Sequence, residues 1–360
     1  MEEIKIIRTA NPKQKPPEND LPFGKYFTDH MFVLEYDEGE GWHSPVIKPY
    51  EPLQIDPATM VLHYGQAVFE GLKAYPTKDG RTLLFRPRRN FERLNASDER
   101  LCIPALDVDF AIHALKELIK VDIDWIPKAP NTTLYIRPFV IATEIAIGVH
   151  PSHSYKFIII LSPVGPYYPE GLDPVRICVE DEYVRTVKGG IGFTKASANY
   201  AISLKGQEKA KELGFTQVLW LDGVERRYVE EVGTMNIFFK IAGEVITPEL
   251  SSGSILAGVT RDSVIQMLKH WGVPVHERKI DIQEIIDAAK NGALEESFGS
   301  GTAAVVSPIG EFFTEGESLK VGNGETGELA KRLYGELTGL QYGDKEDVFG
   351  WVVDVNEETR

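Results

Sequence analysis

A segment rich in proline and glycine, Ser162–Pro174, divides the chain near its middle. It holds four prolines and two glycines in thirteen residues, a density that sustains neither a helix nor a central strand. Segments of this kind separate domains, and clefts form where domains meet. We therefore predict an N-terminal α/β domain over residues 1–162, a linker over 163–174 and a C-terminal domain over 175–360.

The first half begins with a polar, proline-rich arm over residues 1–22, which we expect to be extended. Apolar residues at helical spacing predict helices over Asn90–Ala96 and Ala111–Trp125. Runs of β-branched and aromatic residues predict buried strands over Thr82–Arg86, Thr133–Ile141 and Phe157–Leu161.

The second half mixes the same two patterns. A long helix is predicted over Ser197–Leu213, and a second helix, with Thr260 as its N-cap, over Thr260–Trp271. Asp222-Gly223 between two β-forming runs predicts a hairpin. Further strands are predicted over Val175–Val179, Met235–Phe239 and Val245–Thr247. Because strands and helices do not alternate regularly, we predict the α+β class rather than regular βαβ winding.

Composition excludes several classes of protein. The 360 residues carry 39 basic and 54 acidic side chains, a net charge of −15, which disfavours nucleic acid and anionic membrane surfaces as partners. No apolar run is long enough for a membrane span, and the start of the sequence does not resemble a secretory signal. With only Cys102 and Cys178, a disulfide scaffold is excluded, and a cytoplasmic location is expected.

The segment Gly189–Tyr200 surrounds Lys195 with small residues, which leave room for a bulky group near the backbone. A confined lysine loses water and its pKa falls, as an amine nucleophile requires. A P-loop does not fit, because Lys195 stands three residues after Gly192 rather than directly after a glycine. A dinucleotide-binding loop does not fit either, because it needs a glycine where Lys195 stands. The alternative is a glycine-rich surface turn with a solvated lysine.

Four further segments could carry chemistry, and each has a plainer interpretation. Tyr228–Asn236 contains Glu231, whose alternative is an acid on a solvated edge strand, and Leu256–Asp262 could be a simple helix cap. Phe298–Ala304 could be only a small-residue turn. Leu62–Gly71, with Arg93 further along, could be aromatic core residues beside an arginine.

The pair His150 and His153 is a candidate metal motif. A proline intervenes, and no acidic or cysteine partner stands at ligand spacing. We therefore predict no metal site and interpret these histidines as loop residues.

Taken together and in order, these segments resemble the branched-chain amino acid aminotransferases, which are fold-type IV pyridoxal-phosphate enzymes. The resemblance runs from Phe23 to Trp351. Its most specific pieces are Phe69–Gly71, Tyr135–Pro138, Lys195 with Asn199-Tyr200, Glu231–Asn236, Gly258–Arg261 and Gly301–Ala303. The resemblance implies a two-domain fold with a cofactor cleft at the domain interface, and pyridoxal 5′-phosphate as the cofactor of the C-terminal domain.

The resemblance also implies roles around the cofactor. Lys195 would form the Schiff base and later carry the proton at the substrate α-carbon, and Glu231 would keep the pyridine nitrogen protonated. Tyr200 would hydrogen-bond the phenolic oxygen of the cofactor. The phosphate and its surroundings would be contacted by Arg93, Val259, Thr260 and Thr302.

Substrate contacts are implied as well. Thr302 and Ala303 would offer amides to the substrate carboxylate, and Arg137 would meet the side-chain carboxylate of glutamate. The remaining pocket residues implied by the resemblance are Phe23, Tyr64, Phe69, Tyr135, Val149, Tyr167 and Thr234. The loop Ile145–Val149 resembles one that reaches into the pocket of a neighbouring subunit, so a homodimer is implied.

The activity implied is transfer of an amino group between leucine, isoleucine or valine and 2-oxoglutarate, by a ping-pong mechanism. Two alternatives stay open at this point. One is another fold-type IV activity, that of a D-amino acid aminotransferase or an aminodeoxychorismate lyase. The other is a catalytically silent member that serves as a binding protein.

Overall fold

The computed structural model describes residues 3–166 and 172–357, and these form two compact units. The first unit contains residues 3–166, 194–197 and 339–357, and the second contains the described residues between them. The units are therefore discontinuous in sequence: the segment with Lys195 and the C-terminal end both belong to the first. The predicted linker lies partly outside the described residues, and the domain boundaries at 162 and 175 stay a prediction.

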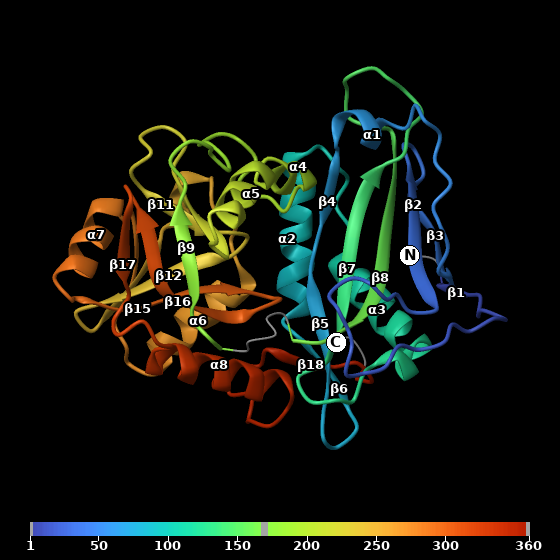
Figure 1. Cartoon of the computed structure of the whole chain (residues 1–360). Helices are drawn as coiled ribbons and strands as arrows, with labels where there is room; N and C mark the ends of the chain where they lie inside the picture. The colour runs from blue at the N-terminus through green and yellow to red at the C-terminus, as the bar shows by residue number, and fades with distance from the viewer. Residues whose placement is uncertain (1–2, 167–171, 358–360) are drawn as a thin grey trace. The chain divides into compact units, whose positions relative to one another are not determined.

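The first unit is built on a sheet of nine described strands in the order β1-β3-β2-β8-β7-β5-β6-β18, with β4 paired to β7 (Figure 1). Their bounds are β1 Lys5–Ile6, β2 His30–Asp37, β3 Gly41–Pro49, β4 Ala67–Phe69, β5 Leu72–Pro76, β6 Thr82–Phe85, β7 Thr133–Ala142, β8 Ser154–Val164 and β18 Val352–Asp354. All neighbouring pairs are antiparallel except β1 with β3. The central strands are buried on both faces, so they are almost continuously apolar.

Helices cover this sheet. They are α1 Met60–Tyr64, α2 Pro87–Arg100 and α3 Val108–Val121, followed by the 3₁₀ turn Ile123–Trp125. The Asp107 carboxylate caps α3 by accepting the Phe110 N–H, and the apolar stripe of α3 packs on β2. Proline at the first position of α2 suits a helix start, and α2 packs on β4 and α3 (Figure 1).

The second unit contains a mixed sheet of nine described strands, in the order β11-β10-β9-β16-β15-β12-β13-β14, with β17 paired to β16. Their bounds are β9 Val175–Val179, β10 Gln217–Leu221, β11 Val229–Val232, β12 Asn236–Ile241, β13 Glu244–Pro248, β14 Val275–Arg278, β15 Leu294–Gly301, β16 Val305–Thr314 and β17 Glu317–Lys320. The helices that lie wholly or mostly in this unit are α4 Ser197–Ala201, α5 Leu204–Glu212, α6 Val259–His270, α7 Ile282–Lys290 and α8 Glu328–Gln341, with the 3₁₀ turn Leu250–Ser252. Two sheets with helices packed beside them confirm the α+β class.

The single helix predicted over Ser197–Leu213 is wrong, because the structure has two helices, α4 and α5, there. The Ser203 hydroxyl donates to the Tyr200 carbonyl at the break. Serine competes in this way with the regular helical hydrogen bonds. The helix predicted over Thr260–Trp271 corresponds to α6, which begins one residue earlier, at Val259. Its N-cap is Gly258 rather than Thr260.

The connection after Asp222 is also longer than a tight hairpin. Strands β10 and β11 pair antiparallel as predicted, but seven residues join them. The Asp222 carboxylate accepts four backbone N–H groups from this loop, those of Val224, Glu225, Arg227 and Tyr228. Burial alone would raise the pKa of Asp222, but these donors hold it below its ordinary value.

Pro163 and Val164, at the start of the predicted linker, continue strand β8 and pair with β7. Pro163 is tolerated because β2 pairs with β8 only as far as Ile160, which leaves the proline on an unpaired edge. None of the helices in the described residues has the length and apolar character needed to cross a membrane.

Candidate active site

Lys195 is held by the backbone of its own segment in the first unit. Its carbonyl accepts the Phe69 N–H at 3.0 Å, and its N–H donates to the Ser97 hydroxyl at 2.9 Å. Ala196 forms an antiparallel bridge with Val68. The Lys195 side chain is half-buried, and its Nζ lies 4.8 Å from the centre of the Phe69 ring. The backbone at Lys195 is therefore fixed by contacts with Phe69, Ser97 and the neighbouring bridge, while its side chain stays partly exposed, which argues against a free surface turn.

An arginine surrounded by aromatic rings shares the Phe69 ring with Lys195. The Arg137 guanidinium is 4.6 Å from the Phe69 ring, and its Nη2 donates to the Tyr135 hydroxyl at 3.0 Å. Phe23 meets the Tyr135 ring edge-on at 4.8 Å. The Arg137 Nε is buried and has no hydrogen-bond partner within the described residues. Since a buried donor without a partner is costly, this arrangement suits an anionic ligand.

Gly71 makes room for this arrangement. A Cβ at this position would lie 2.2 Å from the Tyr135 hydroxyl oxygen. Any side chain at position 71 therefore displaces Tyr135, which carries the hydrogen bond to Arg137. The glycine in the Phe69–Gly71 motif is explained by this close approach and not by turn geometry.

Glu70 and Arg93 form a buried ion pair in the first unit. The Arg93 Nε and Nη2 donate to the two Glu70 oxygens at 2.7 and 2.9 Å, and Asn90 and the Gly71 N–H add further hydrogen bonds. Burial alone would raise the pKa of Glu70, but the Arg93 guanidinium holds it below its usual value. A two-pronged pair of this kind fixes the plane of the guanidinium.

Glu231 is buried in β11 of the second unit and has an arginine partner too. Its Oε2 accepts from the Arg185 Nε at 2.9 Å, and its Oε1 accepts the Leu256 N–H at 2.8 Å. Arg185 also donates to the Gly192 carbonyl at 3.2 Å. The Arg185 Nη1 is buried without a hydrogen-bond partner among the described residues. β11 is the edge strand of its sheet, but the Glu231 carboxylate is buried and hydrogen-bonded rather than solvated.

Val259 and Thr260 occupy the first turn of α6, a helix of twelve residues, and both are buried. Gly258 precedes them, and a Cβ there would lie 2.0 Å from the Asn236 Oδ1. Asn236 in turn donates to the Leu256 carbonyl at 2.9 Å. The backbone is therefore held tightly where a helix presents its first amides, which favours an anion.

Thr302 and Ala303 form the turn between β15 and β16, where Gly301 pairs with Val305. Val305 has a φ of 61°, a conformation that β-branched residues rarely adopt. Such strain costs about 1–3 kcal/mol and concentrates at functional sites. The Ser300 and Ser307 hydroxyls beside this turn are buried without hydrogen-bond partners in the described part of the chain.

The other predicted residues lie on other elements, and one of them, Tyr200, interacts electrostatically with Arg185. The Tyr64 hydroxyl donates to the Ile147 carbonyl, so Tyr64 joins the loop Ile145–Val149, whose Val149 is 84% exposed. Thr234 is exposed in the turn between β11 and β12, and Tyr200 is half-buried in α4. Tyr167 lies outside the described residues.

Sequence analysis missed Arg185 as a partner of Glu231 and Glu70 as a partner of Arg93. The partners are 46 and 23 residues apart, and no local pattern joins them. The only available signal was that Glu70 stands inside a specific motif, Phe69–Gly71.

Comparison with known proteins identifies the family. The family model for amino-transferase class IV matches residues 67–312. A branched-chain-amino-acid aminotransferase 2 from Bacillus subtilis is 59% identical, over 98% of this chain and 97% of its own length. Two solved branched-chain amino acid aminotransferases are similar in fold. The Escherichia coli protein has a TM-score of 0.76 at 28% identity, covering 91% of this chain and 99% of its own. The T.th. protein, solved with pyridoxamine 5′-phosphate, has a TM-score of 0.73 at 27% identity. The match covers 90% of this chain and 98% of that one. The sequence motifs, the fold and these relatives together show that this chain belongs to the branched-chain-amino-acid aminotransferases, within the class IV aminotransferase family.

Proposed function

We propose that this aminotransferase moves the amino group between leucine, isoleucine or valine and 2-oxoglutarate, with pyridoxal 5′-phosphate as its cofactor. The observation that carries the proposal is the setting of Lys195, a half-buried amine with both backbone groups held and an aromatic ring beside its Nζ. Family membership supports the reaction, and one relative was solved with pyridoxamine 5′-phosphate, the aminated form of the cofactor.

The donor set suits a phosphorylated pyridine. The first amides of α6 at Val259 and Thr260, with Arg93 and Thr302, are proposed to hold the phosphate. Glu231, kept in place by Arg185, is proposed to accept a hydrogen bond from the ring nitrogen, because its oxygens retain acceptor capacity. Tyr200 is proposed to donate to the phenolic oxygen.

When bound, pyridoxal phosphate supplies an electron sink for the charge that develops at the substrate α-carbon. Lys195 is proposed to remove and return the proton at that carbon. Its backbone hydrogen bonds to Phe69 and Ser97 restrict where Nζ can reach. Proton transfer by a positioned side chain contributes about 10²–10⁴-fold to a rate.

Dual specificity for an apolar and an acidic side chain is proposed to lie in the aromatic cluster around Arg137. Leucine packs against apolar faces, and the 2-oxoglutarate carboxylate pairs with the guanidinium, whose Nε has no partner in the described residues. Thr302 and Ala303 are proposed to bind the α-carboxylate of either substrate. The remaining substrate contacts proposed are Phe23, Tyr64, Phe69, Tyr135, Val149, Tyr167 and Thr234.

Assembly and location are part of the proposal. Ile145, Ile147 and Val149 expose 65, 72 and 84% of their surfaces on one loop, and clustered exposed apolar residues favour an interface. We propose a homodimer, which sedimentation would establish. Two unpaired cysteines, Cys102 and Cys178, support a reducing cytoplasm.

Lys195→Ala tests the proposal, and Lys73 offers a matched control. Lys73, in β5 of the same unit, is a buried amine, and burial lowers its pKa to about 8. We expect Lys195→Ala to abolish the visible absorbance of bound pyridoxal phosphate and to slow leucine transamination by about a thousandfold. Lys73→Met should keep both signals. Turnover at the parent rate in Lys195→Ala would show that another amine carries the reaction.

A stereochemical assay separates the proposal from its nearest rival. The parent protein should transfer nitrogen from L-leucine to 2-oxoglutarate and leave D-alanine unreacted. Activity restricted to D-alanine would replace the proposal with a D-amino acid aminotransferase. Failure to bind pyridoxal phosphate at all would favour a silent binding protein.

A further inference from the structure

Two histidines and a glutamate meet at the base of the exposed loop Ile145–Val149. Glu144 precedes the loop, and His150 and His153 follow it. One donor atom from each of these three side chains lies within 4.8 Å of the other two. Sequence analysis predicted no metal here because it found no acidic partner near the histidines. The fold supplies one, since β7 and β8 bring the two ends of their connection together.

The hydrogen bonds of His150 leave one ring nitrogen facing Glu144. Its Nδ1 lies 2.9 Å from the Pro151 carbonyl, which can only accept, so Nδ1 carries the proton. In the neutral ring, Nε2 then carries a lone pair, 3.9 Å from the Glu144 Oε1. Two acceptors face each other at this distance, an arrangement that a cation between them stabilises.

His153 completes the set from the other side of Glu144. Its Nδ1 lies 3.0 Å from the Glu144 Oε2, and its Nε2 lies 3.7 Å from the exposed carboxylate of Glu38. With a metal at Nδ1, the ring proton moves to Nε2, where Glu38 can accept it after a small rotation. Metal-bound histidines almost always donate their second nitrogen to a carboxylate or carbonyl in this way.

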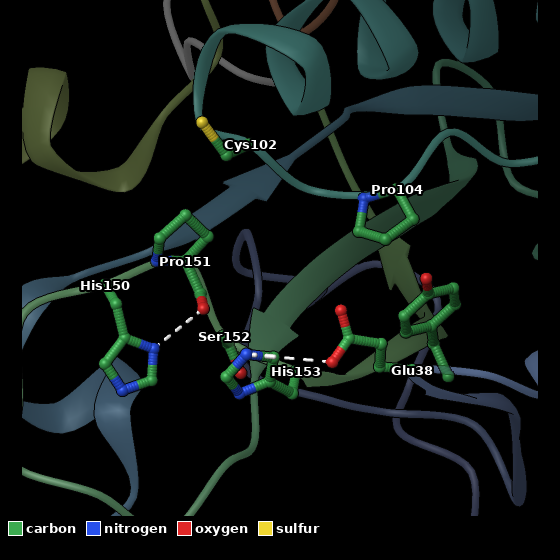
Figure 2. A pocket seen from close by; sticks show the side chains of 8 residues that line it. Glu38, Cys102, Pro104, His150, Pro151, Ser152 and His153 are labelled. Carbon is green, nitrogen blue, oxygen red and sulfur yellow. Dashed lines mark hydrogen bonds and ion pairs between the residues drawn. The ribbon is translucent and has the colours of Figure 1, made fainter.

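A cavity of about 430 Å³ opens beside the two histidines. Figure 2 shows His150 and His153 along one side of it, with Glu38 facing His153 and Cys102 away from both. The cavity leaves room for a water molecule as a fourth ligand. Ligands around zinc lie about 3.4 Å apart at bond lengths near 2.1 Å, so the two exposed histidines need only rotate slightly toward the half-buried Glu144.

We propose that Glu144, His150 and His153 bind a divalent transition-metal ion of borderline softness, of which Zn²⁺ is the model. Imidazole nitrogen favours such ions over Mg²⁺ or Ca²⁺, which prefer oxygen alone. Because the ligands flank Ile145–Val149, the ion clips the ends of this loop together and restricts its motion. The site does not depend on the proposed transamination.

Calorimetric titration of the purified holoprotein with ZnCl₂, without amino acid, tests the proposal. We expect one Zn²⁺ per chain and no response to MgCl₂. His150→Gln and His153→Gln should each weaken binding at least tenfold. His43→Gln is the matched control, because His43 also lies beside two carboxylates, at 3.0 Å from Asp37 and 3.8 Å from Glu40, but belongs to no cluster of metal-ligand side chains among the described residues.

Two further arms keep the test decisive. Cys102→Ser should bind Zn²⁺ as the parent does, and hydrogen exchange of Ile145–Val149 should slow on adding ZnCl₂ in the parent but not in His150→Gln. The proposal is overturned by the absence of saturable binding, by undiminished binding in the two histidine variants, or by equal loss in His43→Gln or Cys102→Ser.

Discussion

Each unit holds a buried glutamate–arginine pair among its described residues. The two pairs differ in which partner, the arginine or the glutamate, is held in position by the other. In the first unit, Glu70 accepts four hydrogen bonds, and its effect is to orient Arg93. In the second, Arg185 and the Leu256 N–H hold the carboxylate of Glu231. We infer that one pair positions a cation for the phosphate and the other positions an anion for the ring nitrogen.

Each pair also has a buried acidic neighbour whose pKa is raised. Asp98, on the same helix as Arg93, is buried with neither carboxyl oxygen hydrogen-bonded within the described residues, and burial raises its pKa well above the ordinary value. Glu230, next to Glu231, accepts from the Ser254 hydroxyl, and burial raises its pKa to about 7. In both units, therefore, the acid that accepts hydrogen bonds from an arginine stands beside a buried acid whose pKa burial raises.

The largest effect is expected from Glu231→Gln. The amide places an N–H against the donors of Arg185 or Leu256, so stability should fall by about 3 kcal/mol. Turnover should fall about a hundredfold even when the cofactor is saturating, because the ring nitrogen loses its anion. Steady-state kinetics and urea unfolding measure the two effects. Unchanged turnover in the folded variant would remove Glu231 from the proposed machinery.

Glu70→Gln should act on affinity rather than on turnover. Arg93 loses its charged partner and its fixed plane, so the dissociation constant for pyridoxal phosphate should rise about tenfold. The rate at saturating cofactor should stay near that of the parent. A fall in saturated turnover with parent-like cofactor affinity would contradict the division of roles between the two pairs.

Glu230→Gln tests the raised pKa in the second unit. A group that binds its proton more tightly when folded stabilises the fold below its unfolded pKa, near 4.5, and this contribution is lost as pH rises through about 7. Between these two pH values the free energy of unfolding of the parent should fall by up to about 3 kcal/mol, and that of the glutamine variant should not show this fall. Urea midpoints from pH 4.5 to 8 measure this difference. Parallel curves for the two proteins would show that Glu230 titrates normally.

Asp98→Asn tests the raised pKa of Asp98 in the first unit. Here we predict only the direction in which stability changes with pH. Because folding raises the pKa of Asp98, the parent loses stability as pH rises above the ordinary aspartate range. The variant should be the more stable protein at neutral pH, and the two should converge in acid. Thermal unfolding at pH 4 and pH 7.5 is the measurement. A variant less stable at pH 7.5 would indicate a partner for the ionised Asp98.

Local patterns predicted much of the fold and the main chemistry. Strands such as Val175–Val179 were predicted from residue type alone and match β9. Lys195 and Glu231 were singled out because small residues and a β-context are visible in a short window. The failures, at Ser203 and Gly258, lie at helix ends, where one side-chain hydrogen bond or a backbone angle decides the boundary.

The sequence by itself determined which residue types are available, where the chain must turn and which family it belongs to. It could not pair Glu70 with Arg93, join Arg185 to Glu231, return residues 352–354 to β6, or bring Glu144 to His153. These contacts depend on strand register and helix packing, which bring distant residues together without a local signature. Tertiary structure thus decided which buried acids have a cationic partner and which lie buried without one.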